Sequence, residues 1–505
     1  MHAILRSFYL FYDIKGSSPN TSGYLMRLPA KVAFPVVLLL WLVGCAINPA
    51  TGRRQFSLMS EGQEIQMGRD ADPEIVASMG LYPDESLQAY VQDLGTQLAA
   101  NSERPDLPWT FRVLDDPLIN AFALPGGYIY VTRGILAHFE SEAELAGVLG
   151  HEIGHVTARH SVSQISKQQI AQIGLGVGMI LKPELQQYAG LAGASLQLLF
   201  LKFGRDDERQ ADELGVRYMG RVGYDPVQLS GVMGMLGRVT SEAGGGPPEW
   251  LSTHPNPANR EEDIIEYAAD AEVALDPAMV RREEYLPRLD GMTFGANPRE
   301  GFFEGSHFFH PDMAFQFEFP DGWQTMNSKQ AVQAASQEGD AVMALTLAQG
   351  ATPSVALNEF LSQEGVEAGR SSDDDINGIP AASADFQANT QDGVLQGRVV
   401  FLNYGGTLLR FMGFGANDAW QNRRGAVRSS LESFRVLRDR SKLDVEPVRL
   451  RVLTVSRAMD LATLLSREGI SDRADAVRLL NRLEGNPTLP AGQILKLPVG
   501  GVLPG

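Results

Sequence analysis

Cysteine is nearly absent from this chain of 505 residues, which contains only Cys45. No disulfide can form within the chain, so packed apolar cores must stabilise it. Basic residues are outnumbered as well, because 43 Lys and Arg residues face 61 Asp and Glu residues and the formal net charge is -18. A nucleic-acid partner is not expected, since no basic excess is available to replace phosphate counterions.

Long apolar runs are also missing near the N-terminus. The run Val32–Val43 is short for a membrane-spanning helix and is interrupted by Pro35. Arg27 and Lys31 precede it and the letters L-V-G-C close it at Cys45, a layout typical of a signal peptide. The ending resembles a bacterial lipobox, in which the cysteine is lipidated and becomes the mature N-terminus. An uncleaved anchor with an incidental cysteine is the alternative.

We therefore predict that residues 1–45 are a lipoprotein signal peptide and that a lipid on Cys45 attaches the chain to a membrane. Ala46 rather than Asp follows the cysteine. By resemblance to the bacterial sorting rule, this favours the outer membrane of a Gram-negative bacterium, with the chain in the periplasm. The first 25 residues fit neither interpretation, and Met26 would give a normal start.

The strongest motif is His151-Glu152-Ile153-Gly154-His155. Residues four apart share one face of an α-helix, so His151 and His155 are predicted to bind one Zn2+ ion per chain. Zinc lowers the pKa of water toward neutrality, and Glu152 is placed to take its proton during attack on a carbonyl. The pattern on a helix is typical of a zinc metallopeptidase.

The motif lies inside a predicted helix, as this chemistry requires. Ser141-Glu142-Ala143-Glu144 is a capping box, and apolar residues continue after it at helical spacing. His160 follows His155 by five residues, which places it about 140° away round a helix. It cannot share the ion unless the helix breaks, so we predict a packing role or a contact with a ligand.

The stretch Asn120–Val131 precedes the metal helix. Gly126-Gly127 is a turn signal, and the residues after it are rich in β-formers. One interpretation is a hairpin strand in a small sheet. The other is an edge strand that pairs with the extended backbone of a substrate, with contacts at Gly127, Tyr128 and Ile129. Its place before the metal helix favours the second.

An open catalytic zinc site needs three protein ligands, and the acidic stretch Asp206–Glu213 supplies the third. Glu208 and Asp212 share a helical face with Ala211 and Gly215, whose small size allows close approach to the metal helix. We predict that Glu208 binds the ion and that Asp212 accepts a hydrogen bond from a ligating imidazole. A solvated acidic face is the alternative when the stretch is considered alone.

These motifs together resemble the zinc peptidases that include HtpX-type heat-shock proteases and CAAX prenyl endopeptidases. The lipobox and the following Asn48-Pro49-Ala50-Thr51-Gly52 segment are most similar to the periplasmic BepA-like branch. The resemblance implies a mainly helical gluzincin domain with a small β-sheet and endopeptidase activity on polypeptides. It assigns the zinc ligands to His151, His155 and Glu208, and the catalytic base to Glu152.

Ser252-Thr253-His254-Pro255, followed by Arg260, matches a further motif of that branch. The Gly- and Pro-rich segment Gly244–Pro248 precedes it, so we expect a loop that moves. We predict that His254 takes part in catalysis, either as a displaceable fourth zinc ligand or as a donor to the oxyanion of the tetrahedral intermediate. A surface-loop histidine is the alternative.

Two apolar runs, Ile170–Ile180 and Ala189–Leu201, lie between these motifs. Each is too short to span a bilayer, so we predict a buried helical hairpin. Contact with a membrane near the site is the alternative.

The peptidase domain is predicted at residues 46–285, followed by a charged linker at 286–306. Residues 307–440 mix strand-like runs with helical patterns, which predicts a separate α+β domain of unknown role. The BepA-like branch carries helical repeats here, and this sequence shows no such period. His307 and His310 lack a third ligand, so no second metal is assigned.

Residues 446–499 resemble a degenerate LysM module, a short βααβ unit. The matching segments are a strand, two helices and a closing strand: Arg449–Val455, Asp460–Arg467, Arg473–Leu483 and Pro490–Leu497. Ala458-Met459-Asp460 stands in place of the usual Gly-Asp-Thr turn. A packing or protein-docking module is therefore the alternative to peptidoglycan binding.

The predicted fold class is α+β and multidomain. The predicted function is a lipid-anchored zinc endopeptidase that cleaves misfolded or stalled envelope proteins. The alternatives are a largely masked protease that works as a chaperone or scaffold in outer-membrane assembly, and a peptidoglycan-associated binding protein. The expected partners are polypeptide substrates, the membrane, and peptidoglycan or the outer-membrane assembly machinery.

Overall fold

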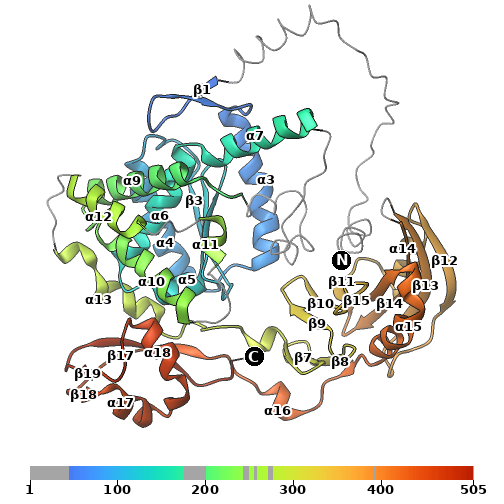
Figure 1. The fold of residues 1–505 in the computed structure, drawn as a ribbon. Coiled ribbons are helices and arrows are strands. Elements are labelled where there is room, and N and C mark those ends of the chain that lie inside the picture. Colours follow the sequence, from blue (N-terminus) through green and yellow to red (C-terminus); the bar gives the residue numbers. More distant parts are fainter. Residues whose placement is uncertain are drawn as a thin grey trace, which may run out of the picture.

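The computed structural model describes residues 45–175, 201–242, 249–254, 259–270, 277–390 and 393–503 (Figure 1). A mainly helical peptidase part, a part built on a seven-stranded sheet and a C-terminal module follow one another along the chain. No helix within these ranges has both the length and the apolar character needed to cross a membrane. The predicted signal peptide before Cys45, the segment Gly244–Pro248 and most of the second apolar run lie outside the described residues.

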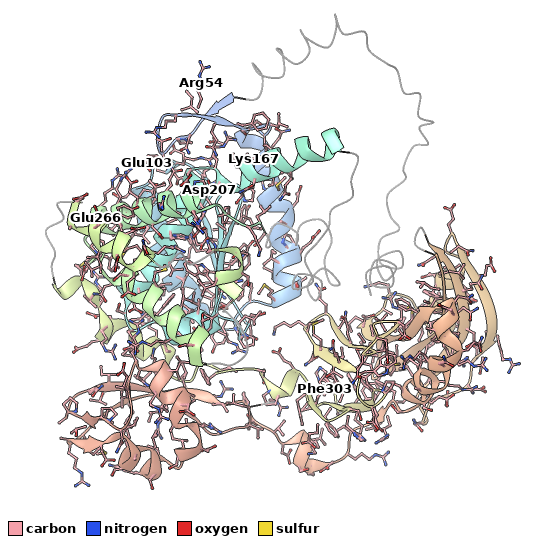
Figure 2. The ribbon with its side chains drawn as sticks, viewed as in Figure 1. Arg54, Glu103, Lys167, Asp207, Glu266 and Phe303 are labelled. Carbon is pink, nitrogen blue, oxygen red and sulfur yellow. The ribbon has the colours of Figure 1, made fainter. Side chains whose placement is uncertain are left out.

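The peptidase part is built from helices around one small sheet. Its helices are α3 (Glu61–Met79), α4 (Glu85–Ala100), α5 (Arg133–His138), α6 (Glu142–Thr157), α7 (His160–Leu175), α9 (Arg205–Val222), α10 (Gln228–Glu242), α11 (Glu249–Thr253), α12 (Arg260–Asp270) and α13 (Arg282–Tyr285). Its strands are β1 (Cys45–Ile47), β2 (Arg54–Phe56), β3 (Thr110–Leu114), β4 (Ala121–Leu124) and β5 (Tyr128–Thr132). The side chain of Arg54 on β2 is exposed and points away from this part (Figure 2).

Local signals in the sequence start two of these helices. Ser60 and Gln63 form a reciprocal capping box at the start of α3. Ser141 caps α6, because its hydroxyl accepts a hydrogen bond from the amide of Glu144 at 3.2 Å. The Glu144 carboxylate accepts instead from the amide of Glu140 at 2.8 Å, so the second half of this box is shifted by one residue.

Helix α6 runs through the middle of the peptidase core and is buried along its whole length. It packs closely on α9, as the small residues on α9 predicted. A Cβ atom added to Gly215 would lie 3.0 Å from the amide nitrogen of His151, and one added to Gly150 would lie 3.2 Å from Gly215. The two backbones therefore touch, and this contact brings the side chains of α9 to those of α6.

The three-stranded sheet has the order β3-β5-β4, with β5 in the centre. Strand β5 pairs in parallel with β3 and antiparallel with β4 along its length, and Gly127 accepts a hydrogen bond from Thr110. The prediction of a substrate-binding edge strand at Gly127, Tyr128 and Ile129 is therefore wrong. The edge strands are β3 and β4, and β4 is the one next to α6 in the packing.

The second part is built on the antiparallel sheet β12-β13-β14-β15-β11-β10-β9. Its strands are β9 (Gln324–Asn327), β10 (Ala331–Ala335), β11 (Ala341–Leu347), β12 (Val366–Ser372), β13 (Ala381–Thr390), β14 (Gly393–Tyr404) and β15 (Thr407–Ala416). Helix α14 (Pro353–Leu361) covers one face and α15 (Asn417–Glu432) the other, each over its own apolar core. A second sheet joins β6 (Phe302–Glu304), β7 (His307–His310), β8 (Phe315–Glu318) and β16 (Arg435–Val436).

The predicted linker at 286–306 is wrong in its extent. Leu286 and Leu289 are fully buried in the peptidase core, and Phe303 belongs to β6 (Figure 2). The charged residues of this segment made it resemble a linker in the sequence, although Leu286 and Leu289 pack into the core.

The C-terminal module has the predicted βααβ order. Its elements are β17 (Arg449–Thr454), β18 (Met459–Asp460), α17 (Leu461–Glu468), α18 (Ala474–Leu480), β19 (Thr488–Leu489) and β20 (Ile494–Val499), reached through α16 (Arg440–Leu443). Its fold class agrees with the prediction, whereas its assignment as a LysM-like module stays a prediction. Leu450 and Leu480 belong to the apolar core of the peptidase part, so the module packs directly against it (Figure 1).

Candidate metal centre

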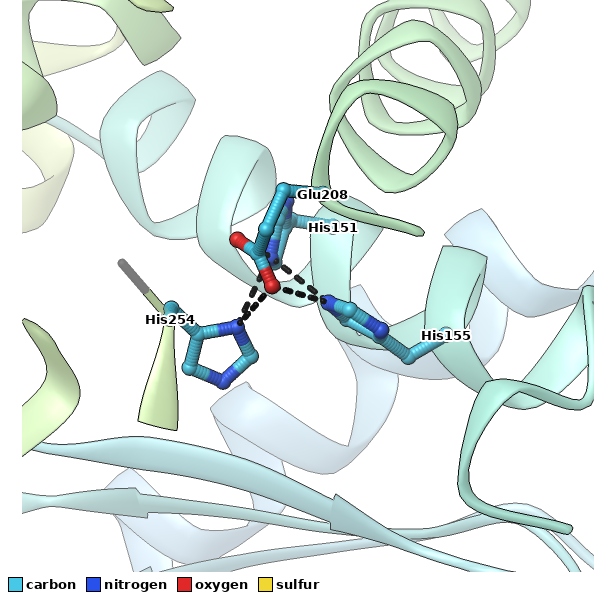
Figure 3. A group of neighbouring side chains, drawn as sticks. All are labelled: His151, His155, Glu208 and His254. Atoms are coloured by element: carbon cyan, nitrogen blue, oxygen red, sulfur yellow. Dashed lines mark hydrogen bonds and ion pairs between the residues drawn. The ribbon is translucent and has the colours of Figure 1, made fainter. Parts of the chain in front are cut away.

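Four side chains converge between α6, α9 and the end of α11 (Figure 3). His151 and His155 come from α6, Glu208 from α9, and His254 from the residue after α11. One ligand atom from each lies within 4.8 Å of all the others, and all four residues are buried. The Nε2 atoms of His151 and His155 are 3.0 Å apart, and Glu208 Oε1 lies 3.1 Å from His254 Nδ1.

Each imidazole of α6 is oriented by a bond to its other nitrogen. His151 Nδ1 lies 2.9 Å from Asp212 Oδ1, so the proton is on Nδ1 and donates to this carboxylate. This bond leaves the Nε2 atom of His151 facing the cluster, 3.0 Å from Nε2 of His155. Asp212 was predicted from the sequence to act in this way.

His155 is oriented by His160. The Nδ1 atoms of the two rings are 2.9 Å apart, and His160 Nε2 lies 2.9 Å from Gln210 Oε1. Since the amide oxygen accepts, His160 carries its proton on Nε2 and its Nδ1 accepts from His155. The Nε2 atom of His155 is therefore also free of a proton. Burial lowers the pKa of both rings, which keeps them neutral.

This contact exists because the helix breaks between Thr157 and His160, a break that the sequence pattern did not predict. Helix α6 ends at Thr157, Arg159 adopts a left-handed conformation with φ 59°, and α7 begins at His160. The break turns His160 back toward His155, on the side of that ring away from the other ligands. The predicted contact with a ligand is what the structure shows.

Arg260, the first residue of α12, holds the carboxylates of α9. Its Nε and Nη2 atoms donate to both oxygens of Asp212 at 2.8 and 2.7 Å, and its Nη1 lies 3.0 Å from Glu208 Oε2. Burial by itself would raise the pKa of Asp212, but the guanidinium and His151 hold that pKa below its ordinary value. Both carboxylates therefore stay ionised.

The donor set fits a divalent cation such as zinc. Two imidazole nitrogens and one carboxylate oxygen converge on the same space, together with Nδ1 of His254. Lone pairs at such distances repel unless a cation lies between them, and two or three imidazoles with a carboxylate are ligands that zinc prefers. The predicted ligands His151, His155 and Glu208 are thus brought together, with His254 as a fourth.

Glu152 and His254 are closed off from solvent in this conformation. Glu152 is 0% exposed, and Trp250 on α11 donates from its indole Nε1 to Glu152 Oε1 at 3.3 Å. The other oxygen, Oε2, has no hydrogen-bond partner within the described chain. His254 Nε2 lies 3.7 Å from Glu152 Oε1. Burial by itself would lower the pKa of His254, but Glu208 and Glu152 raise it above its ordinary value.

Two aromatic residues at the site were not found from the sequence. Phe203 stacks on His155 with ring centroids 4.0 Å apart, and Trp250 stacks on His254 at 4.9 Å. Trp250 precedes His254 by four residues, which is one helical turn, and this spacing next to the Ser-Thr-His-Pro motif is the signal that could have found it. Phe203 carries no comparable signal.

Among the described strands, the sheet edge next to the site belongs to β4. Thr132 donates to the carbonyl of Asn120, which fixes the alternation in this antiparallel pair. The backbone groups of Ala121 and Ala123 therefore point away from β5. Asn120 is buried and its Oδ1 atom has no partner among the described residues. The carbonyl of the preceding residue, Ile119, accepts a bond from the amide of Trp250, so this edge adjoins α11.

Comparison with known proteins agrees with this geometry. A model of peptidase family M48 matches residues 85–268, which include the four converging side chains. A β-barrel assembly-enhancing protease of Yersinia pestis is 33% identical over 227 residues, or 43% of this chain and 46% of that protein. A mitochondrial metalloendopeptidase OMA1 of Schizosaccharomyces pombe is 30% identical over 236 residues, or 45% of this chain and 67% of that protein.

The chain spans about half the length of the first of these relatives. Among solved structures, the cyanobacterial PsbP of Synechocystis covers 26% of this chain with a TM-score of 0.23 and 17% identity, over 94% of its own length.

Proposed function

The chain belongs to peptidase family M48, and on this premise we propose that it is a zinc-dependent endopeptidase whose catalytic base is Glu152. The observation that carries the proposal is the convergence of His151, His155, Glu208 and His254 beside Glu152, inside an otherwise apolar core. A bound zinc ion would act as a Lewis acid toward water and the scissile carbonyl.

Glu152 supplies the proton transfers in this proposal. Its carboxylate lies beside the ligand cluster, it follows the first ligand on α6, and its Oε2 atom is unpartnered among the described residues. It would take a proton from the attacking water and give a proton to the leaving amine. The surrounding apolar core strengthens these electrostatic interactions by excluding water.

His254 is proposed to close the site as a displaceable ligand. Four protein ligands complete a tetrahedral zinc site, whereas a catalytic site keeps one position open. Because Trp250 and His254 cover Glu152, α11 must move before water and a peptide can reach the base. Once displaced, His254 would be placed to donate to the oxyanion, which is the second role considered for it.

The edge of β4, in place of β5, is proposed to bind the substrate backbone. The outward amide and carbonyl groups of Ala121 and Ala123 suit an extended peptide added as a further strand. The unpartnered Oδ1 atom of Asn120 suits a peptide N–H at the same edge. Polypeptides in an extended conformation are therefore the proposed substrates.

The envelope location is proposed from Cys45 and from the relatives. Cys45 begins β1, so a lipid on this residue would lie directly next to the folded peptidase part. One relative is a protease that enhances β-barrel assembly by its name, which supports misfolded or stalled outer-membrane proteins as substrates. Peptidoglycan binding by the C-terminal module stays a prediction.

One experiment tests the function. An unfolded outer-membrane protein is incubated with the wild-type chain and with Glu152→Gln, and the zinc content of both is measured. We expect about one zinc per chain in both proteins and cleavage by the wild type alone. Full zinc occupancy without cleavage by either protein would favour the scaffold alternative, and absence of zinc from both would contradict the metal assignment.

A further inference from the structure

The second part of the chain contains a polar groove that the peptidase chemistry does not use. It lies between α15 and the strands β12, β13 and β14 at one end of the seven-stranded sheet; Figure 1 shows these elements side by side. Its volume is about 790 Å³, and a second hollow of about 420 Å³ continues from it along β12. The two hollows share Arg370, Asp385, Arg398 and Arg428.

Four arginines line the groove, and two of them are paired within the protein. Arg398 donates to Asp385 at 2.7 Å, and Arg428 donates to Glu432 at 2.7 Å. Arg370 and Arg424 are exposed, and their side chains form no hydrogen bond or ion pair with any described residue. Glu367 and Asp385 are the acidic residues of the groove lining, so its four arginines leave an excess of two positive charges, whereas the second hollow adds Asp374, Asp375 and Glu432.

The remaining lining suits a peptide backbone. The amide side chains of Gln387, Gln396 and Gln421 line the groove, and amides pair with peptide N–H and C=O groups. Strand β12 is the terminal strand of the sheet among the described residues, so the side of its backbone that faces away from β13 has no strand partner, at the outer rim of the groove. A register irregularity between Ala368 and Ser371 places the exposed Arg370 within this edge.

We propose that this groove binds an extended, acidic segment of a polypeptide. The open edge of β12 would pair with the backbone, while Arg370 and Arg424 would receive carboxylates through charge-assisted hydrogen bonds. A nucleic acid is disfavoured by the net charge of the chain. A lipid tail is disfavoured because the lining is polar or glycine apart from Ala368, Phe386 and Trp420. The binding is independent of cleavage, and its use in capturing substrates rests on the proposed peptidase function.

Fluorescence anisotropy of labelled peptides tests the proposal on the full-length Glu152→Gln variant, which leaves the peptides intact. The two peptides are an extended sequence alternating Glu with Thr and the same sequence with Gln in place of Glu. We expect the acidic peptide to bind at least about tenfold more tightly than its Gln counterpart, with a preference that falls as salt is raised. Equal binding of the two peptides would overturn the proposal.

A matched pair of double variants locates the site. Arg370→Gln with Arg424→Gln should weaken binding of the acidic peptide by about tenfold. Arg435→Gln with Arg438→Gln, which changes two exposed arginines of the same part outside both hollows, should leave binding within about twofold. Equal weakening by both pairs would show non-specific attraction and would overturn the assignment.

Backbone pairing has its own test. The acidic peptide is methylated at alternate backbone nitrogens, which removes hydrogen-bond donors and keeps the charges. Weaker binding is expected if β12 pairs with the peptide. Unchanged binding of the methylated peptide would show an anion site without strand pairing and would contradict the proposal. Complete displacement of the acidic peptide by inorganic phosphate, added at the same total concentration of negative charge, would contradict it in the same way.

Cleavage assays on a protein substrate with and without an acidic extension separate this proposal from the peptidase proposal. With the wild-type chain, the acidic extension should lower KM without changing kcat. With the double variant Arg370→Gln and Arg424→Gln, the extension should no longer lower KM. Absence of all cleavage would contradict the peptidase proposal and leave the anisotropy result intact.

Discussion

At the scale of single residues, two neighbours determine which nitrogen of each α6 histidine faces the metal. Asp212 accepts from His151 Nδ1, and His160 accepts from His155 Nδ1. Both arrangements leave Nε2 as the free ligand atom. Substitution of a residue that orients a ligating histidine typically changes the metal affinity strongly, although the residue does not touch the ion.

His160→Phe should therefore weaken zinc binding by about 10–100-fold, because His155 loses the acceptor that fixes its ring and its tautomer. Competition with a chromogenic chelator measures this affinity. His307→Phe, a change of a half-buried histidine on β7 that lies outside the site, is the control and should leave the affinity unchanged. An affinity of His160→Phe within twofold of the wild type would contradict the role given to this residue.

His254→Ala should raise the turnover of a protein substrate by roughly tenfold, which corresponds to removing a displacement cost of about 1.4 kcal/mol. The reason is that loss of the fourth ligand leaves an open position. Steady-state cleavage under saturating zinc measures the effect. Unchanged turnover would show that His254 is not part of the mechanism, and turnover as low as that of Glu152→Gln would assign it to oxyanion stabilisation instead.

At the scale of elements, local signals in the sequence were enough to place the helices that carry the site. Ser141 caps α6, the helix that it was predicted to start, and His151 and His155 lie on that helix as predicted. The i, i+4 spacing of Glu208 and Asp212 also predicted that both would face α6. Each of these features depends on residues within one or two helical turns.

The features that the sequence did not predict depend on contacts between distant segments. The edge strand was placed at β5, but β5 becomes central because β3, which precedes it, pairs with it in parallel. No pattern within β5 distinguishes these two positions. Leu286 and Leu289 were assigned to a linker because charged residues surround them, and Trp250 was missed because its partners Glu152 and His254 lie on different segments.

The close packing of α6 on α9 gives a prediction for Gly215. In Gly215→Ala the new Cβ would lie 3.0 Å from the His151 amide nitrogen, a cost of about 1–3 kcal/mol that exceeds the gain in helix propensity of about 1 kcal/mol. Thermal unfolding should show destabilisation. Gly237→Ala on α10, where a Cβ meets no atom within 4 Å, is the matched control and should stabilise the protein. The same sign for both variants would contradict the packing argument.

At the scale of the whole molecule, α6 is held at both ends by segments from outside the matched peptidase region. At its C-terminal end, the Asn48 amide donates to the carbonyl of Ala158 at 3.2 Å. At its N-terminal end, Arg482 of the C-terminal module pairs with Glu144 at 2.7 Å. Buried Lys496 on β20 donates to the carbonyls of Ala137 and Phe139 at 2.9 and 2.7 Å. The module is thus part of the framework that positions the metal helix.

Lys496→Met should destabilise the peptidase part and the module together, by about 1–3 kcal/mol, because two buried carbonyls lose their donor while the volume is kept. Calorimetry should show one shared unfolding transition at lower temperature. Lys167→Met, a change of an exposed lysine on α7, should shift it by less than about 0.5 kcal/mol. A separate transition of the module alone would show that it is an independent domain.

The central claim is that a zinc ion sits among three histidines and Glu208, with His254 as the ligand that closes the site. X-ray absorption at the zinc edge, on the wild type and on His254→Ala, tests it directly. The prediction is zinc bound only to nitrogen and oxygen at about 2.0–2.1 Å, with three imidazoles in the wild type and two in the variant. Absence of zinc, or identical spectra from the two proteins, would contradict it.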